Sequence, residues 1–370
     1  MRIVNILFLL TIAVLVMVPA GGLAQHAWRS LPELRAAYRA AGGLGQVADL
    51  AAATDRYVAA NYGRRDDMIY FDARLRNAFG ADTRHVAYGT DGFLFLKDDD
   101  VFSQATGQRV DWLAMQPLIH LATQLDADAK RRGRKFLFVV TPNKHTIYRR
   151  HLPVWARAAP KVTETDLLYD RLNALGIPAL DLRDRLAADA ERLPVYWRGD
   201  THWTGLGMVI GFDAMAEALG FPQAALDAGK VYSGTQSVKR PGDLVRMAGL
   251  GKDWNDIAPK LAGKNPLSPG GLRSQVLGRF GAFHTVRISH EASEGARTGG
   301  PRVLVLGDSF TTKSFGPLFM RFASGYLWTH HRFGDFDGKP VEEFGPDIVI
   351  LQVAERSIVA FHDRPATLAR

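Results

Sequence analysis

Short apolar runs alternate with segments of helical periodicity along most of this 370-residue chain, and no other feature constrains its fold as strongly. A run of about four to eight apolar residues bounded by turn residues is typical of a strand that is buried on both faces. Helices between such strands favour a mostly parallel sheet with helices on both faces, which is an α/β fold. The strands are expected at residues 136–140, 178–182, 303–306 and 348–353.

Helices are predicted between and beside these strands. Leucine and alanine recur at helical spacing over residues 118–129 and 167–175, and Gly176 can end the second helix. Residues 205–219 form a third apolar helical segment that stops at a glycine, and residues 314–327 are predicted to be a fourth helix.

The order of the segments predicts how the domains are arranged. Residues 25–84 are rich in alanine and arginine and indicate helices ahead of the main fold. An Asp-Gly turn within residues 88–96 predicts a β-hairpin where the main domain, residues 85–365, begins. The Gly- and Lys-rich stretch 231–300 interrupts the alternation, so we expect an insertion that runs over the surface.

The first residues are typical of an export signal. Arg2 precedes an apolar run over residues 3–18, and small residues up to Ala24 offer a cleavage site before Gln25. Residues 1–24 are therefore expected to be a signal peptide, or a signal anchor if they are not cleaved. Either outcome places the body of the protein outside the cytoplasm, in the periplasm.

The composition excludes several classes of protein and site. With 47% hydrophobic and 23% charged residues, the chain is not typical of a disordered protein, a fibre or a multi-span membrane protein. It contains no cysteine, so it forms no disulfide, thiolate zinc site or cysteine nucleophile. Lys and Arg total 46 against 38 for Asp and Glu, and the net charge of +8 suits an anionic polymer or a membrane surface.

Ser309 is the first candidate for chemistry. It follows the strand predicted at 303–306 through a small residue and a tight turn. In doubly wound sheets ligands gather at the carboxyl ends of the strands, and a helix N-terminus there can stabilise an oxyanion. The alternative is structural, with Asp308 and Ser309 forming an ordinary helix cap.

Asp200 and His202 are the second candidate, because one residue separates them. In an extended segment they point to the same side, so Asp200 could accept the Nδ1 proton of His202. The other ring nitrogen could then deprotonate a serine hydroxyl.

Two other interpretations of this pair remain open. Asp200 could cap the helix that begins near Thr204, while His202 packs beside a tryptophan. A metal site could instead combine Asp200 and His202 with His330 or His331, although no zinc-type spacing joins these histidines.

Two further polar segments follow predicted strands. Asn143 could donate a hydrogen bond to an oxyanion, and Lys144 could hold an anionic or hydroxyl-rich substrate. Glu355 and Arg356 follow the last strand, where they could face substrate or pair with each other inside the protein.

Taken together, these motifs resemble the SGNH-hydrolase-like domain of the alginate O-acetyltransferase family, of the AlgJ and AlgX type. Each motif is short, and the joint signal lies in their order through an exported chain. The residues that carry the resemblance, within residues 88–357, are the segment 88–96, Thr-Pro-Asn-Lys at 141–144, Tyr148, Leu152-Pro153, Asp-Thr-His-Trp at 200–203, Gly-Asp-Ser-Phe at 307–310 and Ala-Glu-Arg at 354–356.

The resemblance implies a flavodoxin-like sheet and a catalytic triad. Ser309 would be the acyl-accepting nucleophile, His202 the general base and Asp200 the carboxylate that orients it. Common SGNH hydrolases carry the serine early, so Asp-x-His ahead of the serine is the permuted arrangement of the acetyltransferases. Few residues follow Ser357, which makes the single-domain, AlgJ-like form the expected one and puts a separate carbohydrate-binding module in doubt.

The resemblance also implies a function: periplasmic transfer of an acetyl group, through an acetyl-serine, to hydroxyls of an exopolysaccharide such as alginate. A membrane-bound O-acyltransferase would supply the acetyl group, and we expect no cofactor, metal or nucleic-acid partner. Tyr148 and Trp203 would join Asn143, Lys144 and Arg356 in binding the polysaccharide, although Trp203 could equally lie in the core. A secreted carbohydrate esterase and a non-catalytic polysaccharide-binding subunit of an export complex are the alternatives.

Overall fold

The computed structural model describes residues 65–157, 161–251, 254–263, 266–280, 282–291, 299–312, 314–332 and 339–361. The predicted signal segment 1–24 and most of the predicted helical segment 25–84 lie outside these residues. The chain divides into two compact units, Met1–Phe79 and Gly80–Arg370. In the first unit the described part is helix α3 (Arg65–Phe79). Within the described residues, no helix combines the length and apolar character that crossing a membrane requires.

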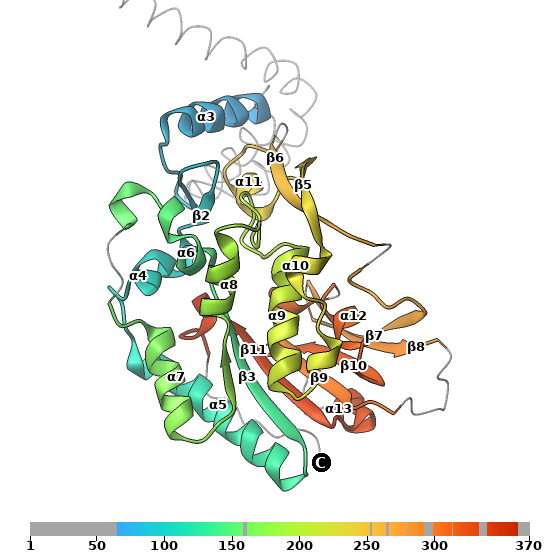
Figure 1. Ribbon diagram of the computed structural model, residues 1–370. Helices are drawn as coiled ribbons and strands as arrows, with labels where there is room; N and C mark the ends of the chain where they lie inside the picture. The colour runs from blue at the N-terminus through green and yellow to red at the C-terminus, as the bar shows by residue number, and fades with distance from the viewer. Residues whose placement is uncertain are drawn as a thin grey trace, which may run out of the picture. The chain divides into compact units, whose positions relative to one another are not determined.

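The second unit is built on a seven-stranded sheet with the order β4-β3-β11-β9-β10-β8-β7 (Figure 1). The five strands from β4 to β10 are parallel, and β8 and β7 extend the sheet with antiparallel pairing. This confirms the mostly parallel sheet. The strands are β3 (Lys135–Thr141), β4 (Ala179–Asp181), β7 (Leu272–Phe280), β8 (Phe283–His290), β9 (Arg302–Gly307), β10 (Gly325–His330) and β11 (Ile348–Ala354).

Side chains of alternating residues enter two separate cores, one on each face of the sheet. In β3, Leu137 and Val139 belong to one core, and Phe136 and Phe138 belong to the other. Helices therefore cover both faces, as predicted. The first core is closed by α8 (Arg183–Ala190), α9 (Gly205–Ala218) and α12 (Gly316–Phe319), and the second by α5 (Trp112–Arg131), α7 (Glu164–Ala174) and α13 (Lys339–Phe344).

The ends of two predicted helices have clear causes. Thr163 and Asp166 form a reciprocal capping box at the start of α7, and Gly176 follows its end with a φ of 66°. Thr204 caps α9 by accepting hydrogen bonds from the backbone N–H groups of Leu206 and Gly207. The helices predicted at 167–175 and 205–219 are confirmed.

The helix predicted over residues 314–327 is wrong. The structure has only the four-residue helix α12 there, followed by strand β10. Tyr326 and Trp328 lie in β10, where aromatic residues favour a pleated strand. Pairing of β10 with β9 on one side and β8 on the other outweighs the helical spacing of the apolar residues.

The prediction for residues 231–300 is half wrong. β5 (Tyr232–Lys239) and β6 (Asn255–Leu261) form a separate two-stranded sheet, whereas β7 and β8 join the central sheet. Strand pairing extends the antiparallel edge of the sheet, so this half is part of the main fold and does not run over its surface. Short helices α10 (Ala228–Val231) and α11 (Asp243–Met247) flank β5.

The predicted hairpin at 88–96 is confirmed as the antiparallel pair β1 (Val86–Tyr88) and β2 (Leu94–Leu96). Asp91 and Gly92 in its turn both have positive φ, which Asp and Gly tolerate better than most residues. The remaining short elements are helices α4 (Val101–Thr106) and α6 (Lys144–Ile147) and the 3₁₀ turns Asp98–Asp100, Arg149–His151, Val154–Ala156, Pro222–Ala224, Ser309–Thr311 and Glu355–Ser357.

Candidate active site

Ser309 lies at the carboxyl end of β9, where the chain turns at once into the 3₁₀ turn Ser309–Thr311. The turn is tight because Gly307 has no side chain. A Cβ atom at Gly307 would lie 2.0 Å from Oγ1 of Thr311 and 2.8 Å from Nε1 of Trp328. The local packing thus requires glycine two residues before the serine.

Asp308 fixes the shape of this turn. Its Oδ1 atom accepts hydrogen bonds from the backbone N–H of Phe310 and from Nε2 of Gln352, and its Oδ2 atom accepts one from the backbone N–H of Ala354. Burial alone would raise the pKa of this carboxyl, but the contacts with His331 and Phe310 hold it below its ordinary value. Asp308 is therefore an ionised cap, as the structural interpretation predicted, while Ser309 is directed elsewhere.

The structure brings Ser309, His202 and Asp200 together. Nε2 of His202 lies 2.8 Å from Oγ of Ser309, and Nδ1 of His202 lies 2.7 Å from Oδ1 of Asp200. The ring position is fixed further because the backbone N–H of His202 donates to the same Asp200 oxygen, at 3.0 Å. This is the geometry of a nucleophile, a base and an orienting acid.

Asp200 is held as a carboxylate. Burial raises the pKa of its carboxyl, but the hydrogen bonds from His202 and the charge of Arg240 outweigh burial and lower that pKa well below its ordinary value. The helix-cap alternative for Asp200 is wrong, since Thr204 caps α9 and Asp200 bonds to His202.

Two residues that the sequence did not single out complete this cluster. Nη1 of Arg240 lies 2.8 Å from Oδ2 of Asp200, and its guanidinium stacks over the ring of Trp197 at 4.3 Å. Asp243 accepts a hydrogen bond from the backbone N–H of Thr201, and its Oδ2 lies 3.6 Å from Nδ1 of His202. Both residues come from the stretch after β5 that was expected to lie on the surface, so only the charges of its Lys-Arg-Pro-Gly-Asp sequence could have pointed to them.

Lys144 supports the segment that carries Asp200 and His202. It is buried, and its Nζ donates hydrogen bonds of 2.8–3.0 Å to the backbone carbonyls of Trp197, Arg198 and Asp200. Burial lowers the pKa of its ammonium to about 7, against the opposing effect of nearby aspartates. All three of these bonds point into the protein, and the contact of Lys144 with substrate stays a prediction.

Asp256 of β6 holds the same segment from the opposite side. Its carboxylate oxygens accept hydrogen bonds from the backbone N–H groups of Arg198 and Gly199, at 3.1 and 2.9 Å. A side chain at Gly199 would collide with Val245 and Trp254. The backbone just before Asp200 is thus fixed by two buried side chains. Lys144 binds its carbonyls, and Asp256 binds its N–H groups.

Asn143 and Trp203 are both buried and bonded to other parts of the protein, and the contact of Asn143 with substrate stays a prediction. The side-chain amide of Asn143 faces Gln104 at 3.4 Å, and its backbone N–H donates to Glu355. Trp203 is 4% exposed, donates to the backbone carbonyl of Phe310 and stacks on Phe315. For Trp203 the core interpretation is the correct one.

The last three predicted residues have different surroundings: Tyr148 lines a pocket, Arg356 lies beside the triad, and Glu355 is buried. The hydroxyl of Tyr148 accepts a hydrogen bond from the backbone N–H of Val195, yet its ring lines a pocket described below. The half-buried guanidinium of Arg356 lies 5.4 Å from the ring of Phe310, beside the triad. Glu355 is buried and accepts hydrogen bonds from Thr146, Thr165 and Asn143, in place of the expected pairing with Arg356.

A metal ion is the remaining alternative for the cluster. Ligand atoms of Asp200, His202 and Asp243 lie within 4.8 Å of one another. Neither His330 nor His331 belongs to this group among the described residues. The guanidinium of Arg240 already contacts the free oxygen of Asp200, which is the position a cation would need, so this donor set fits an ion-paired triad better than a metal.

Comparison with protein-family models decides the family. Residues 86–274 match the model described as SGNH hydrolase-like domain, acetyltransferase AlgX. The chain belongs to this family. The matched part of this AlgX-type domain includes Asp200 and His202 and ends before Ser309.

The AlgX-type chain is similar to several named proteins. A protein of Pseudomonas aeruginosa named probable alginate O-acetylase AlgJ is 30% identical over 140 residues, which cover 36% of this chain and 32% of the relative. The chain therefore spans about a third of the length of that curated relative.

The chain is also similar, at low identity, to two solved structures. The O-acetyltransferase domain of Pseudomonas putida AlgJ matches with a TM-score of 0.48 and 16% identity, covering 75% of this chain and 94% of the other. Pseudomonas aeruginosa AlgX matches with a TM-score of 0.46 and 17% identity, covering 79% of this chain and 71% of the other.

Proposed function

We propose that this chain is an O-acetyltransferase that carries the acetyl group on Ser309. One observation supports this most strongly: Asp200, His202 and Ser309 form a continuous chain of contacts of 2.7 and 2.8 Å at the carboxyl edge of the sheet. A serine hydroxyl is a weak nucleophile unless an adjacent base takes its proton. His202 occupies the position of that base.

In the first step, Oγ of Ser309 attacks the carbonyl carbon of an acetyl donor while its proton moves to Nε2 of His202. Asp200 stabilises the imidazolium that forms, and the backbone N–H of Ser309 faces the developing oxyanion. The bond to the donor's leaving group then breaks, and the proton on His202 passes to that group. The product is an acetyl ester on Ser309.

In the second step, a sugar hydroxyl takes the place of the leaving group. His202 removes its proton, and the hydroxyl oxygen attacks the acetyl carbon. The bond to Oγ of Ser309 breaks, and His202 returns the proton to the serine. The acetyl group ends on the sugar, and the enzyme is regenerated without a cofactor.

The acceptor we propose is an exopolysaccharide such as alginate, modified in the periplasm after export of the chain. The proposal draws support from the names of the relatives and from the net charge of +8, which suits a polymer of acidic sugars. The acetyl donor we propose is a membrane-bound O-acyltransferase, since an exported enzyme has no access to cytoplasmic acetyl-CoA.

A carbohydrate esterase is the second candidate, and one observation favours it. The side chain of His202 is 28% exposed, so water can reach the base as well as a sugar can. Water in the second step would release acetate and leave the polymer unmodified.

The deciding experiment incubates the purified full chain with a chromogenic acetyl ester, with and without a purified oligosaccharide acceptor. The transferase predicts an oligosaccharide heavier by one acetyl group and a faster release of the chromogen when acceptor is present. Release of acetate alone, at a rate that the acceptor does not change, would favour the esterase. Absence of both products in wild type would favour the non-catalytic binding subunit.

A further inference from the structure

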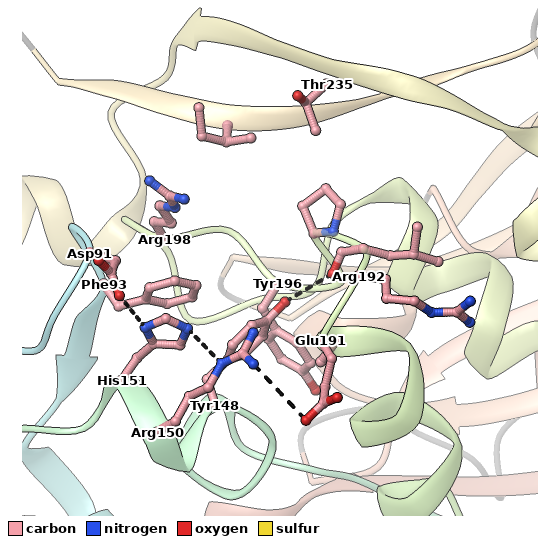
Figure 2. Close-up of a pocket in the computed structure, with 14 residues that line it drawn as sticks. Asp91, Phe93, Tyr148, Arg150, His151, Glu191, Arg192, Tyr196, Arg198 and Thr235 are labelled. Carbon is pink, nitrogen blue, oxygen red and sulfur yellow. Dashed lines mark hydrogen bonds and ion pairs between the residues drawn. The ribbon is translucent and has the colours of Figure 1, made fainter.

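A pocket of about 620 Å³ lies beside the segment that carries the proposed base (Figure 2). This volume is within the range of about 300–1,000 Å³ that small-molecule sites occupy. Four parts of the chain form its walls: the turn of the β1–β2 hairpin, residues 148–151, residues 190–198 and the β5–β6 pair. The hairpin motif and Tyr148 therefore meet here, although the proposed triad uses neither.

The pocket carries more positive than negative side chains. Arg150, Arg192 and Arg198 line it, together with the carboxylates of Asp91 and Glu191. We call it the arginine pocket after these three residues.

The carboxylates already have partners. Asp91 lies 3.0 Å from Nδ1 of His151, Nε of Arg150 donates to His151, and Nη1 of Arg150 lies 4.0 Å from Glu191. Figure 2 shows these four residues joined in one chain of contacts along the pocket. Each carboxylate of the pocket thus has a neighbouring side chain of this group as a partner.

Arg198 stands apart from that chain (Figure 2). Its guanidinium lies over the ring of Phe93 at 5.5 Å, and within the described residues no carboxylate forms an ion pair with it. A guanidinium presents a planar fork of donors that matches a carboxylate, and it is weakly hydrated, so it suits recognition of acidic groups. Arg192 adds a second cation, whose side chain is 78% exposed and lies 3.7 Å from Oδ1 of Asp189 in a solvent-exposed ion pair that a ligand carboxylate can join.

The other polar groups of the pocket suit the hydroxyls of a sugar. Glu191 and Asp91 are 75% and 66% exposed, so each keeps oxygen atoms that can accept hydrogen bonds from a ligand. Thr235 on β5 is exposed and adds a hydroxyl on the opposite wall. A ligand with both a carboxylate and several hydroxyls would use every wall.

The arginine pocket is linked to the proposed triad through one short segment. Arg198 is two residues before Asp200 and four before His202, so its Cα lies within about 14 Å of the Cα of His202. The carbonyls of Arg198 and Asp200 both accept hydrogen bonds from Nζ of Lys144, at 2.9 and 2.8 Å. The pocket wall and the base are thus parts of one rigid support.

We propose that the arginine pocket binds an acidic sugar unit of the acceptor polysaccharide, with the carboxylate of that unit on Arg198 and Arg192. This inference rests on the proposed function and adds to it the place where the acidic acceptor binds and the residues that select it. A neutral sugar lacks the group that Arg198 would bind.

The test measures binding to the full chain by titration calorimetry, with no acetyl donor present. The probes are a purified oligouronate of defined length and a neutral oligosaccharide of the same length. We expect wild type to prefer the oligouronate and Arg198→Gln to weaken its binding by about tenfold, the effect of losing a charge-assisted hydrogen-bonded pair. Arg171→Gln, an exposed arginine on α7 outside the pocket, is the matched control and should bind as wild type does.

A second pair of variants tests the same site without touching a residue that contacts the catalytic segment. Thr235→Glu should weaken oligouronate binding and Thr235→Lys should strengthen it, because the position is exposed on the pocket wall. Equal binding of the two probes by wild type, or variants of Arg198 and Thr235 that all bind as wild type does, would overturn the proposal. Failure of this proposal can be told apart from failure of the proposed function. The binding measurement needs no acetyl donor, and acetylation of Ser309 needs no polysaccharide acceptor.

Discussion

Nζ of Lys144 lies 2.8 Å from the carbonyl oxygen of Asp200, so a buried lysine at the start of α6 holds the backbone of the proposed catalytic acid. The same atom binds the carbonyls of Trp197 and Arg198. Replacing Lys144 by Met keeps an apolar stem of similar length and removes all three bonds. We expect kcat for a small acetyl ester to fall by about 10- to 100-fold with little change in KM, because misplacement of the base acts on the chemical step.

The control for Lys144→Met is a thermal unfolding curve, since a buried substitution can also destabilise the fold. A folded variant with wild-type kcat would contradict the positioning role. A folded variant in which only KM rises would instead indicate that Lys144 acts on substrate binding.

We expect Arg240 to affect catalysis through the charge state of Asp200. Its ion pair of 2.8 Å helps to lower the pKa of that carboxyl, so Arg240→Met should raise the pKa of Asp200. The acid side of the pH–rate profile should move to higher pH, with a loss of roughly tenfold in kcat/KM near neutrality from the missing charge-assisted hydrogen bond. Arg246→Met, on the same short helix α11 as Asp243, is the matched control. Superimposable profiles for Arg240→Met and wild type would be inconsistent with this role.

Asp200→Asn keeps the shape of the carboxylate and removes its charge. An amide cannot stabilise the imidazolium of His202 or hold the ring in the same tautomer, so we expect kcat to fall by about 10³- to 10⁴-fold. Circular dichroism should match wild type. A loss smaller than tenfold in a folded variant would mean that Asp200 does not act on His202 during the reaction.

His145 predicts an acid sensitivity of the fold. It is buried, its Nε2 donates to the carbonyl of Leu96, and burial lowers the pKa of its ring from 6.5 to about 3. The unfolded chain therefore binds a proton as pH falls below 6.5 while the folded chain does not, so the free energy of unfolding falls with falling pH. Between pH 7 and pH 5 this contribution is about 2 kcal/mol.

Urea unfolding at pH 7 and pH 5 measures that contribution. His145→Gln keeps a hydrogen-bond donor and removes the titration, so the difference between the two pH values should shrink by about 2 kcal/mol relative to wild type. His120→Gln, an exposed histidine on α5, should leave the difference unchanged. An unchanged difference in His145→Gln would show that the ring does not stay neutral in the fold.

The sequence was sufficient for the parts of the fold that depend on local pattern. β3, β9 and β11 are continuous apolar runs, and each is buried on both faces as such runs predict. The position of Ser309 followed from the rule that ligands gather at the carboxyl ends of parallel strands. The one-residue spacing of Asp200 and His202 was enough to predict their contact, because extended backbone places such residues on the same side.

What the sequence could not provide depends on contacts between distant segments. The polar loop at 143–144 follows a strand at the correct edge, yet Lys144 turns inward, where its Nζ donates to three backbone carbonyls of the segment 197–200. Arg240 is 40 residues from Asp200, and nothing in its local pattern indicates the ion pair. The strand β10 was predicted as a helix because pairing with β8 and β9, and not its own residue pattern, decides its conformation.

The central claim is that Ser309 becomes covalently acetylated with the help of His202. The most direct measurement is the intact mass of the full chain after brief exposure to a chromogenic acetyl ester, followed by peptide mapping, for wild type, Ser309→Ala and His202→Ala. The account predicts an added acetyl group on the peptide containing Ser309 in wild type and none in either variant. An adduct of equal yield in Ser309→Ala, or an adduct mapped to another residue in wild type, would contradict it.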